Sequence, residues 1–147
     1  MEEYTKLRNF WKNKKVFITG HTGFKGSWMC LMLNLFGAQI YGYSLKPEKK
    51  SLFNQSHCSK FLKKNIFSNI KNKKKLSQSI NKIRPEVLFH LAAQPLVLEG
   101  YKNPIETFDT NIIGTINVLN AMRSCKYLKS AVIITTDKVY KINKNDK

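Results

Sequence analysis

Short apolar runs alternate with longer amphipathic segments along this chain of 147 residues. Five of the runs are rich in β-branched or aromatic residues and too short for helices, which is typical of strands buried in a parallel sheet. We expect these strands at 16–19, 38–44, 61–66, 87–91 and 131–135. Their alternation with helical patterns predicts an α/β fold, a Rossmann-type doubly wound parallel sheet of about five strands in the order 3-2-1-4-5.

The helical patterns between the strands predict which faces are buried. Apolar residues cover most of segment 25–36, so we expect a largely buried helix, with Gly37 as its left-handed C-terminal cap. A second helix, ending near Arg84, is expected to bury one apolar stripe. That stripe consists of Leu76, Ile80 and Ile83.

A third, long helix is predicted between the fourth and fifth strands. Asn103 as the cap, Pro104 at the first position and Glu106 at the third mark its start, and it should run to about Ser124. Its apolar residues recur at helical spacing and are expected to be buried. They are Phe108, Ile112, Leu119 and Met122.

The chain is expected to hold one domain, at 15–147, after a polar and basic lead-in at 1–14. No apolar run is long enough for a membrane span, and the first residues do not resemble a signal peptide. Cysteines at 30, 58 and 125 are scattered, which suits a reducing compartment and does not match the ligand spacing of a zinc site. We therefore expect a cytoplasmic protein without a metal centre or a membrane partner.

The net charge of +17 makes nucleic acid an alternative partner. Only Arg8, Arg84 and Arg123 among the 26 basic residues are arginine, however, and recognition of bases and phosphates favours arginine. We interpret the lysines as a solvated surface and expect no specific nucleic acid. A basic nucleic-acid-binding protein stays an alternative function.

Three glycines, Gly20, Gly23 and Gly26, link the first strand to the first predicted helix. Glycines permit a tight turn and close approach of a pyrophosphate, and the start of a helix attracts negative charge. The glycines are three residues apart, whereas the common dinucleotide fingerprint has its first two glycines two apart. Lys25 at the helix start opposes the helix dipole, which a bound phosphate would explain.

The second strand ends at Ser44, followed by Lys46, where many NAD-binding domains have an acidic residue for the ribose. The residues alone therefore leave NAD and NADP open. Polar or small residues also follow the other strands, at 65–66, 90–95 and 135–140. His90 is expected to be a packed structural histidine.

Taken together, these stretches resemble the extended short-chain dehydrogenase/reductase family, the NAD-dependent epimerases and dehydratases. Within it, the resemblance is to the CDP-glucose 4,6-dehydratases. It is carried by GHTGFKGSW at 20–28, GYSL at 42–45, HLAAQPLV at 90–97 and TDKVY at 136–140.

The resemblance implies NAD as the cofactor and a set of residues around it. The loop residues would line the pyrophosphate, 91–94 the ribose and nicotinamide, and 65–66 the adenine, with Asn in place of the family's Asp. Asn111 is implied near the active site, or else as a buried amide paired to backbone. The implied cofactor residues are Gly20, Thr22, Gly23, Phe24, Lys25, Gly26, Asn65, Ile66, Leu91, Ala92, Ala93, Gln94, Asn111 and Thr135.

The resemblance also implies the reaction, conversion of CDP-glucose to CDP-4-dehydro-6-deoxyglucose and water. Thr136 would hydrogen-bond the sugar 4-hydroxyl, Asp137 would protonate the leaving 6-hydroxyl and Lys138 would serve the C5 proton. Elimination requires such groups, because water leaves poorly without an acid. The complete enzyme is expected to bind CDP-glucose and to be able to form homo-oligomers.

The family's catalytic tyrosine and lysine are expected well after Tyr140, and the sequence ends at Lys147. We therefore expect the N-terminal, NAD-binding part of such a dehydratase, inactive alone. Alternatives are the NAD-binding module of a split enzyme, or part of another sugar-nucleotide epimerase or dehydratase.

Overall fold

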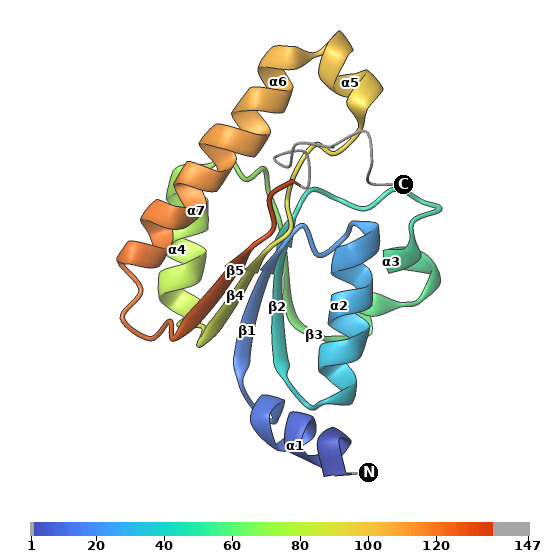
Figure 1. The fold of residues 1–147 in the computed structure, drawn as a ribbon, viewed down its shortest axis with the longest axis vertical. Coiled ribbons are helices and arrows are strands. Elements are labelled where there is room, and N and C mark those ends of the chain that lie inside the picture. Colours follow the sequence, from blue (N-terminus) through green and yellow to red (C-terminus); the bar gives the residue numbers. More distant parts are fainter. Residues whose placement is uncertain (1, 137–147) are drawn as a thin grey trace, which may run out of the picture.

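A single five-stranded parallel sheet with the order β3-β2-β1-β4-β5 forms the centre of the molecule in the computed structural model (Figure 1), which describes residues 2–136. The predicted fold class and strand order are confirmed. The strands are β1 (Lys15–Thr19), β2 (Gln39–Ser44), β3 (Leu62–Phe67), β4 (Val87–His90) and β5 (Ser130–Ile133). The helices are α1 (Glu2–Trp11), α2 (Phe24–Leu35), α3 (Leu52–Gln55), α4 (Lys73–Ile83), α5 (Val97–Lys102), α6 (Pro104–Phe108) and α7 (Gly114–Arg123), with a 3-10 turn η1 (Cys58–Phe61) and a π-helical turn η2 (Asp109–Ile113).

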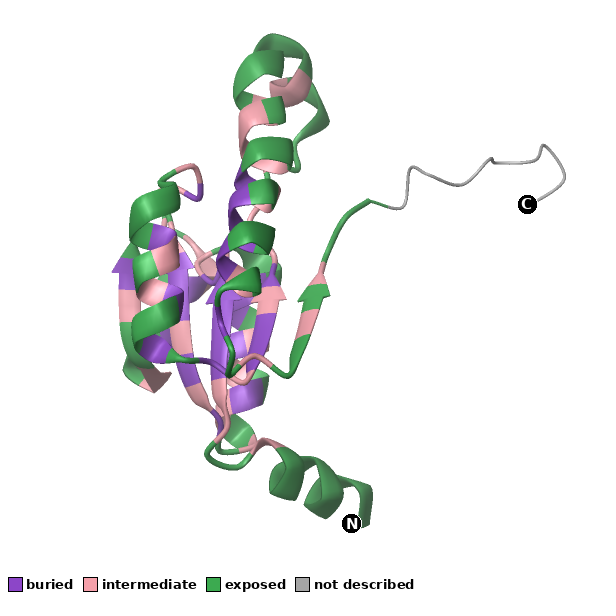
Figure 2. Cartoon of the chain, turned by 90° about the vertical axis from the view of Figure 1, so that its left-hand side faces the viewer, coloured by how far each residue is buried: buried purple, intermediate pink, exposed green. Residues whose placement is uncertain are grey.

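Two apolar cores lie on opposite faces of the sheet. Consecutive strand residues point to opposite faces, so Phe17 belongs to one core and its neighbours Val16 and Ile18 to the other. The first core packs under α4 and α7, and the second under α2, α3 and η1. Figure 2 shows the buried residues concentrated in the strands, while α1 and α5 contain no buried residue. Because all the strand pairs are parallel, the carboxyl ends of the strands lie at the same edge of the sheet.

Several local predictions are confirmed. Leu76, Ile80 and Ile83 are the buried residues of α4. Gly37, just beyond α2, has a φ of +77°, the left-handed conformation expected of a C-terminal cap. The short helix α3, capped by the Ser51 hydroxyl, and the N-terminal helix α1 were not expected from the sequence.

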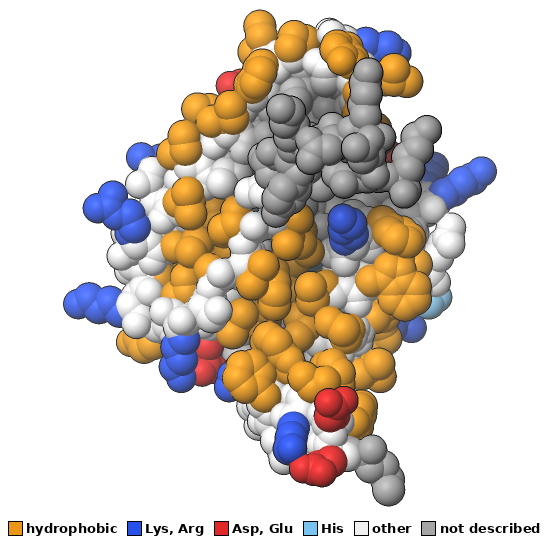
Figure 3. Space-filling model, in the orientation of Figure 1, with side chains coloured by type: hydrophobic (Ala, Val, Ile, Leu, Met, Phe, Trp, Pro, Cys, Tyr) orange, Lys and Arg blue, Asp and Glu red, His pale blue; other side chains and the backbone are white. Residues whose placement is uncertain are grey.

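The prediction that the first crossover helix is largely buried is wrong. Only four residues of α2 are buried, whereas Phe24 and Trp28 are 70% and 55% exposed. A helix lying on a sheet buries one side, and here that side carries small and medium residues. Figure 3 shows hydrophobic side chains gathered on the opposite side of α2. The buried residues are Gly26, Ser27, Cys30 and Leu33.

The predicted burial of the apolar stripe of the long helix is wrong for three of its four residues. Phe108 is 62%, Ile112 49% and Leu119 43% exposed. Met122 is half-buried and packs against the first core. The π-helical turn η2 contains one extra residue per turn and shifts the phase of the helix before α7. Smaller side chains contact the core instead, and Asn103 makes no side-chain cap. The buried residues of α7 are Gly114, Asn117, Val118 and Ala121.

No helix within residues 2–136 is both long enough and apolar enough to cross a membrane. The three cysteines, which lie in this part of the chain, are free and buried.

Candidate functional site

The carboxyl ends of β1 and β4 meet at one edge of the sheet, and the glycine loop lies between them. Leu91 N–H donates to Thr19 O at 3.1 Å, which continues the pairing of the two strands. A Cβ added to Gly20 would lie 2.7 Å from Ala92 N. The two segments that the sequence assigns to the cofactor, 20–26 and 91–94, are therefore in direct backbone contact.

Two of the glycines are required by the geometry of the loop. Gly20 has a φ of +73°, a conformation that L side chains rarely adopt. A Cβ at Gly26 would lie 2.2 Å from Gly20 O, so α2 approaches the loop more closely than any side chain would allow. Gly23 differs, since its φ is −73° and its added Cβ would make an ordinary contact of 3.4 Å.

The N-terminus of α2 presents backbone donors that have no side-chain cap. Gly23 is the cap residue, and no side chain accepts a hydrogen bond from the first turn. The first turn of any helix has N–H groups without intrahelical partners, and together with the dipole they favour an anion. Phe24 and Lys25 are exposed beside these amides. Such a helix start is suited to an anion, and the pyrophosphate expected there from the sequence stays a prediction.

His21 connects the glycine loop to β2 and β3. The sequence pattern did not indicate this role. His21 is fully buried, and its Nε2–H donates to Asn65 Oδ1 at 2.9 Å. Its ring packs on Gly42, where an added Cβ would lie 2.3 Å from the imidazole. Burial lowers the pKa of His21 from 6.5 to about 4, so the imidazole is neutral at physiological pH.

The sequence places Asn65 and Ile66 at the end of the third strand, and that placement is wrong for Asn65. The strand continues to Phe67, and Asn65 lies within it, paired in register with Gly42 and bonded to His21. The same dipeptide, Asn-Ile, recurs at 69–70, directly after the strand. Because the dipeptide occurs at both 65–66 and 69–70, only the strand boundary distinguishes these two copies. Any role of Asn65 toward the adenine stays a prediction.

At the end of β2, two hydroxyl groups bridge the glycine loop and the strand. Thr22 Oγ1 and Ser44 Oγ are 2.7 Å apart, and Thr22 Oγ1 also donates to Leu45 O at 3.1 Å. Ser44 thus lies beside the loop, at the position where dinucleotide-binding folds hold the ribose.

His90 connects β1, β4 and the long helix through a chain of hydrogen bonds. Its Nδ1 lies 2.6 Å from Thr19 Oγ1, and its Nε2 lies 2.9 Å from Thr115 Oγ1. Thr19 Oγ1 accepts from the amides of Leu91 and Ala92, and the Thr115 hydroxyl donates to Asn111 O. We therefore assign Nε2–H as the donor to Thr115 and the Thr19 hydroxyl as the donor to Nδ1.

This directional chain needs a neutral imidazole. Burial lowers the pKa of His90 from 6.5 to about 4. The expectation that His90 is a packed structural residue is confirmed by its burial and its two partners.

Asn111, in the π-helical turn, holds the segment after β4. Its Oδ1 accepts from Gln94 N at 2.8 Å, and its Nδ2 donates to Gln94 O at 3.1 Å. Of the two roles considered for this residue, the structure shows the amide paired to backbone. The contact fixes Gln94 relative to the helix, and Gln94 Nε2 donates in addition to Thr107 Oγ1.

Thr135 and Thr136 are exposed just beyond β5. The parallel sheet places the end of β5 at the same edge as the glycine loop. Asp137 and Lys138, the other two residues of the implied catalytic set, lie outside the described residues.

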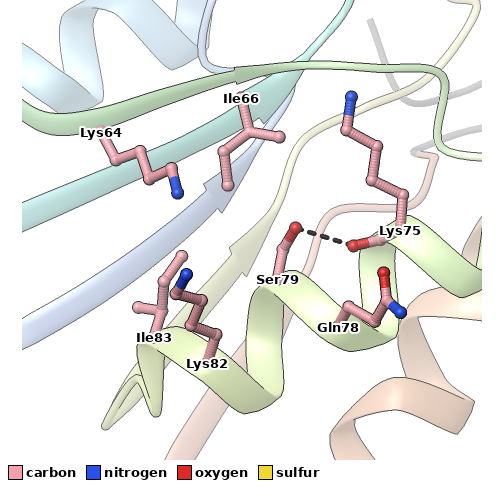
Figure 4. A pocket seen from close by; sticks show the side chains of 7 residues that line it. All are labelled: Lys64, Ile66, Lys75, Gln78, Ser79, Lys82 and Ile83. Carbon is pink, nitrogen blue, oxygen red and sulfur yellow. Dashed lines mark hydrogen bonds between the residues drawn. The ribbon is translucent and has the colours of Figure 1, made fainter.

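Two clefts among the described residues lie away from this edge. A cleft of about 110 Å³ separates β3 from α4, and Lys64 and Lys82 extend into it (Figure 4). Ser79 Oγ donates to Lys75 O at its rim. A second, of about 370 Å³, is lined by residues that include Asn13 and Lys60. Neither of these two clefts is lined by a residue of the glycine loop.

Comparison with known proteins agrees with this geometry. The sequence model of the GDP-mannose 4,6 dehydratase family matches residues 17–143. The chain is 45% identical over 134 residues to a CDP-glucose 4,6-dehydratase of Salmonella typhimurium, which covers 90% of this chain and 37% of that protein. It is 30% identical over 129 residues to a CDP-paratose 2-epimerase of Salmonella typhi, covering 86% of this chain and 38% of that one.

Solved structures show the same fold. A UDP-glucose 4-epimerase from Stenotrophomonas maltophila, determined with bound NAD, superposes with a TM-score of 0.75 at 22% identity over 91% of this chain and 40% of that one. The chain thus spans about two fifths of the length of the relatives it matches. On the family match, which covers most of the sequence, the chain belongs to the GDP-mannose 4,6 dehydratase family.

Proposed function

We propose that this chain is the NAD-binding part of a sugar-nucleotide 4,6-dehydratase that acts on CDP-glucose. The observation that carries the proposal is the contact between the glycine loop and the end of β4, in a chain 45% identical to a CDP-glucose 4,6-dehydratase. The uncapped start of α2 and the close packing at Gly20 and Gly26 form a cradle of backbone that suits a pyrophosphate.

Within this proposal, each segment of the edge holds one part of the cofactor. The pyrophosphate binds at 20–26, and the ribose and nicotinamide lie along 91–94, which Asn111 keeps in place. Asn69 and Ile70, which follow β3, are better placed than Asn65 for the adenine, because Asn65 lies within the strand, paired with Gly42.

When bound, NAD would accept a hydride from the sugar and return it, and the chain's own residues would handle protons. Thr136 would hydrogen-bond the 4-hydroxyl, Asp137 would protonate the leaving 6-hydroxyl and Lys138 would serve the C5 proton. These three roles, and the need for a tyrosine and lysine from further along such an enzyme, are proposals that rest on the family.

The test has two readouts on the 147-residue protein. Isothermal titration calorimetry with NAD should show one site per chain. Incubation with NAD and CDP-glucose, followed by mass spectrometry, should show no loss of water from the sugar nucleotide. A folded chain that does not bind NAD would overturn the cofactor assignment, and turnover by the chain alone would overturn the expectation that further residues are needed.

A further inference from the structure

The glycine loop carries a polar side chain that faces the inside of the protein. Phe24 and Lys25 are exposed and Thr22 is half-buried, whereas His21 is fully buried. Burying a polar ring costs free energy that its hydrogen bonds have to offset. The presence of an imidazole at this position therefore calls for an explanation beyond the filling of space.

Three elements enclose the His21 ring. One face lies on Gly42 of β2, where an added Cβ would be 2.3 Å from the ring Cδ2 and 2.5 Å from Nε2. Phe53 of α3 meets the ring edge-on, with 5.3 Å between centroids, and Phe67 of β3 stacks on it at 6.3 Å and 19°. Close packing of this kind leaves the ring little room to turn, so its orientation is fixed.

The hydrogen bond of the ring reaches β3. Nε2–H donates to Asn65 Oδ1 at 2.9 Å, between residues 44 positions apart in the sequence. The other ring nitrogen, Nδ1, is buried and has no hydrogen-bond partner within residues 2–136. An apolar ring would avoid the cost of that unpaired acceptor, so folding stability alone does not favour histidine here. What the histidine adds is a directional attachment to one point of β3.

A movement of His21 would be passed directly to the loop backbone. Gly20 N–H donates to Tyr43 O at 2.9 Å, immediately before His21. On the other side, a Cβ added to Gly26 would lie 2.7 Å from His21 Cα, so the start of α2 rests on this residue. The amides at the start of α2 therefore depend on where His21 is held.

We propose that His21 and Asn65 are positioning residues, whose hydrogen bond sets the glycine loop relative to β3 so that the loop amides converge on a pyrophosphate. Both act from within the protein, behind the loop. The inference rests on the proposed function, because it assumes that the dinucleotide binds at 20–26. It gives Asn65 a role in holding the loop, in place of the role at the adenine that the sequence implied.

The experiment is a double-mutant cycle on the 147-residue protein, with NAD and ADP titrated by calorimetry. His21→Phe and Asn65→Leu should each raise the dissociation constant of NAD about tenfold or more, because displaced amides no longer converge on the phosphates. The double variant should lose no more than about threefold beyond either single variant, because all three proteins lack the same hydrogen bond. ADP contains the diphosphate without the nicotinamide, so its affinity should fall by the same factor as that of NAD.

Thermal unfolding, followed by circular dichroism, separates positioning from folding. The double variant replaces both partners by apolar groups of similar shape, which is nearly neutral for stability, so its Tm should lie within about 4 °C of the wild type. His21→Gln can donate from nearly the same place as Nε2 and should keep the affinity for NAD within about threefold. Tyr41→Phe is the matched control, because it removes a ring hydrogen bond to Gln39 in β2, and it should leave both affinities unchanged.

The outcomes separate the two proposals. Folded His21→Phe and Asn65→Leu proteins that bind NAD and ADP as tightly as the wild type would overturn this inference and leave the proposed function intact. Additive losses in the double variant, or a loss for NAD without a loss for ADP, would also overturn it, because the two side chains would then act separately or at the nicotinamide end. If His21→Phe does not fold, Asn65→Leu decides, since it keeps the ring and removes its partner. A folded wild-type chain that binds neither ligand would overturn the proposed function, and this inference with it.

Discussion

Replacing Gly26 by alanine tests the packing that creates the cofactor loop. The added Cβ would lie 2.2 Å from Gly20 O, 2.7 Å from His21 Cα and 2.9 Å from Gly20 C. All three neighbours are backbone atoms, which cannot rotate away as a side chain can. Either the start of α2 or the loop has to move.

The size of the effect follows from the overlap. Ordinary contacts begin near 3.4 Å, so the required movement is roughly 1 Å. Overpacking of this kind costs about 1–3 kcal/mol, occasionally more, and alanine recovers up to ~1 kcal/mol as a better helix former. We expect a net loss of about 2 kcal/mol in the free energy of unfolding, which corresponds to roughly 4–8 °C in Tm for a chain of this size.

Gly23→Ala is the control within the same loop. Gly23 has an extended conformation open to alanine, and its added Cβ makes only an ordinary contact. Its free energy of unfolding should change by less than ~1 kcal/mol. Both variants and the wild type would be compared by urea unfolding, followed by circular dichroism.

Binding of NAD supplies the second readout for the Gly26→Ala protein. Displacement of the loop should weaken NAD at least tenfold even at temperatures where the variant remains folded, because misplaced amides no longer converge on the phosphate. If Gly26→Ala is as stable as the wild type and binds NAD equally well, the close approach of α2 to the loop is not what shapes the site.

Three further predictions follow from the buried polar groups and the charge. Burial lowers the pKa of His21 and of His90 to about 4, so the folded chain takes up these protons only near pH 4, while the unfolded chain takes them up near pH 6.5. The contribution of the two neutral histidines to the free energy of unfolding should be complete above about pH 6.5. It should fall toward pH 4 by about 3 kcal/mol per histidine. A free energy of unfolding, measured in urea, that stays constant between those pH values would contradict the assignment of two neutral histidines. Asn111→Leu removes both hydrogen bonds to the Gln94 backbone and should lower the free energy of unfolding by about 1–3 kcal/mol. Asn111→Asp should lower it less, because the aspartate keeps the acceptor. Equal losses for the two variants in urea unfolding would refute the two-bond contact. Duplex DNA should bind only weakly and lose its anisotropy signal as salt is raised to physiological strength, whereas tight binding there would favour the nucleic-acid alternative.

The strands and their order could be predicted because their signals are local. A β-branched run such as 16–19 is too short for a helix, and a positive-φ glycine such as Gly20 or Gly37 marks a turn that few other residues permit. Parallel connectivity through crossover helices then restricts the topology to few choices.

Burial of the helices could not be predicted in the same way. Sequence periodicity shows which residues are apolar, but it does not show which side of a helix meets the sheet. Trp28 and Phe108 are exposed because smaller residues on the other side of each helix make the close contact. The π-helical turn η2, which changes the phase, has no signal in the apolar pattern.

Within the site, the glycine loop at 20–26 could be predicted from the sequence, but the polar side chains that hold it in place could not. The glycine pattern identified 20–26, but His21 was not recognised as its anchor, because the partner that positions it, Asn65, is distant in the sequence. Asn65 was expected at the end of the third strand, whereas the strand continues to Phe67.

The most direct test of the account is to locate NAD on the protein. A titration of the ¹⁵N-labelled chain with NAD, followed by amide chemical shifts, should move chiefly the amides at 20–26 and 91–94, which the structure places in contact. Saturable binding confined to these two segments is the predicted result. Shifts that avoid the glycine loop and instead follow the lysines of the cleft between β3 and α4, or no shifts from a folded chain, would contradict it.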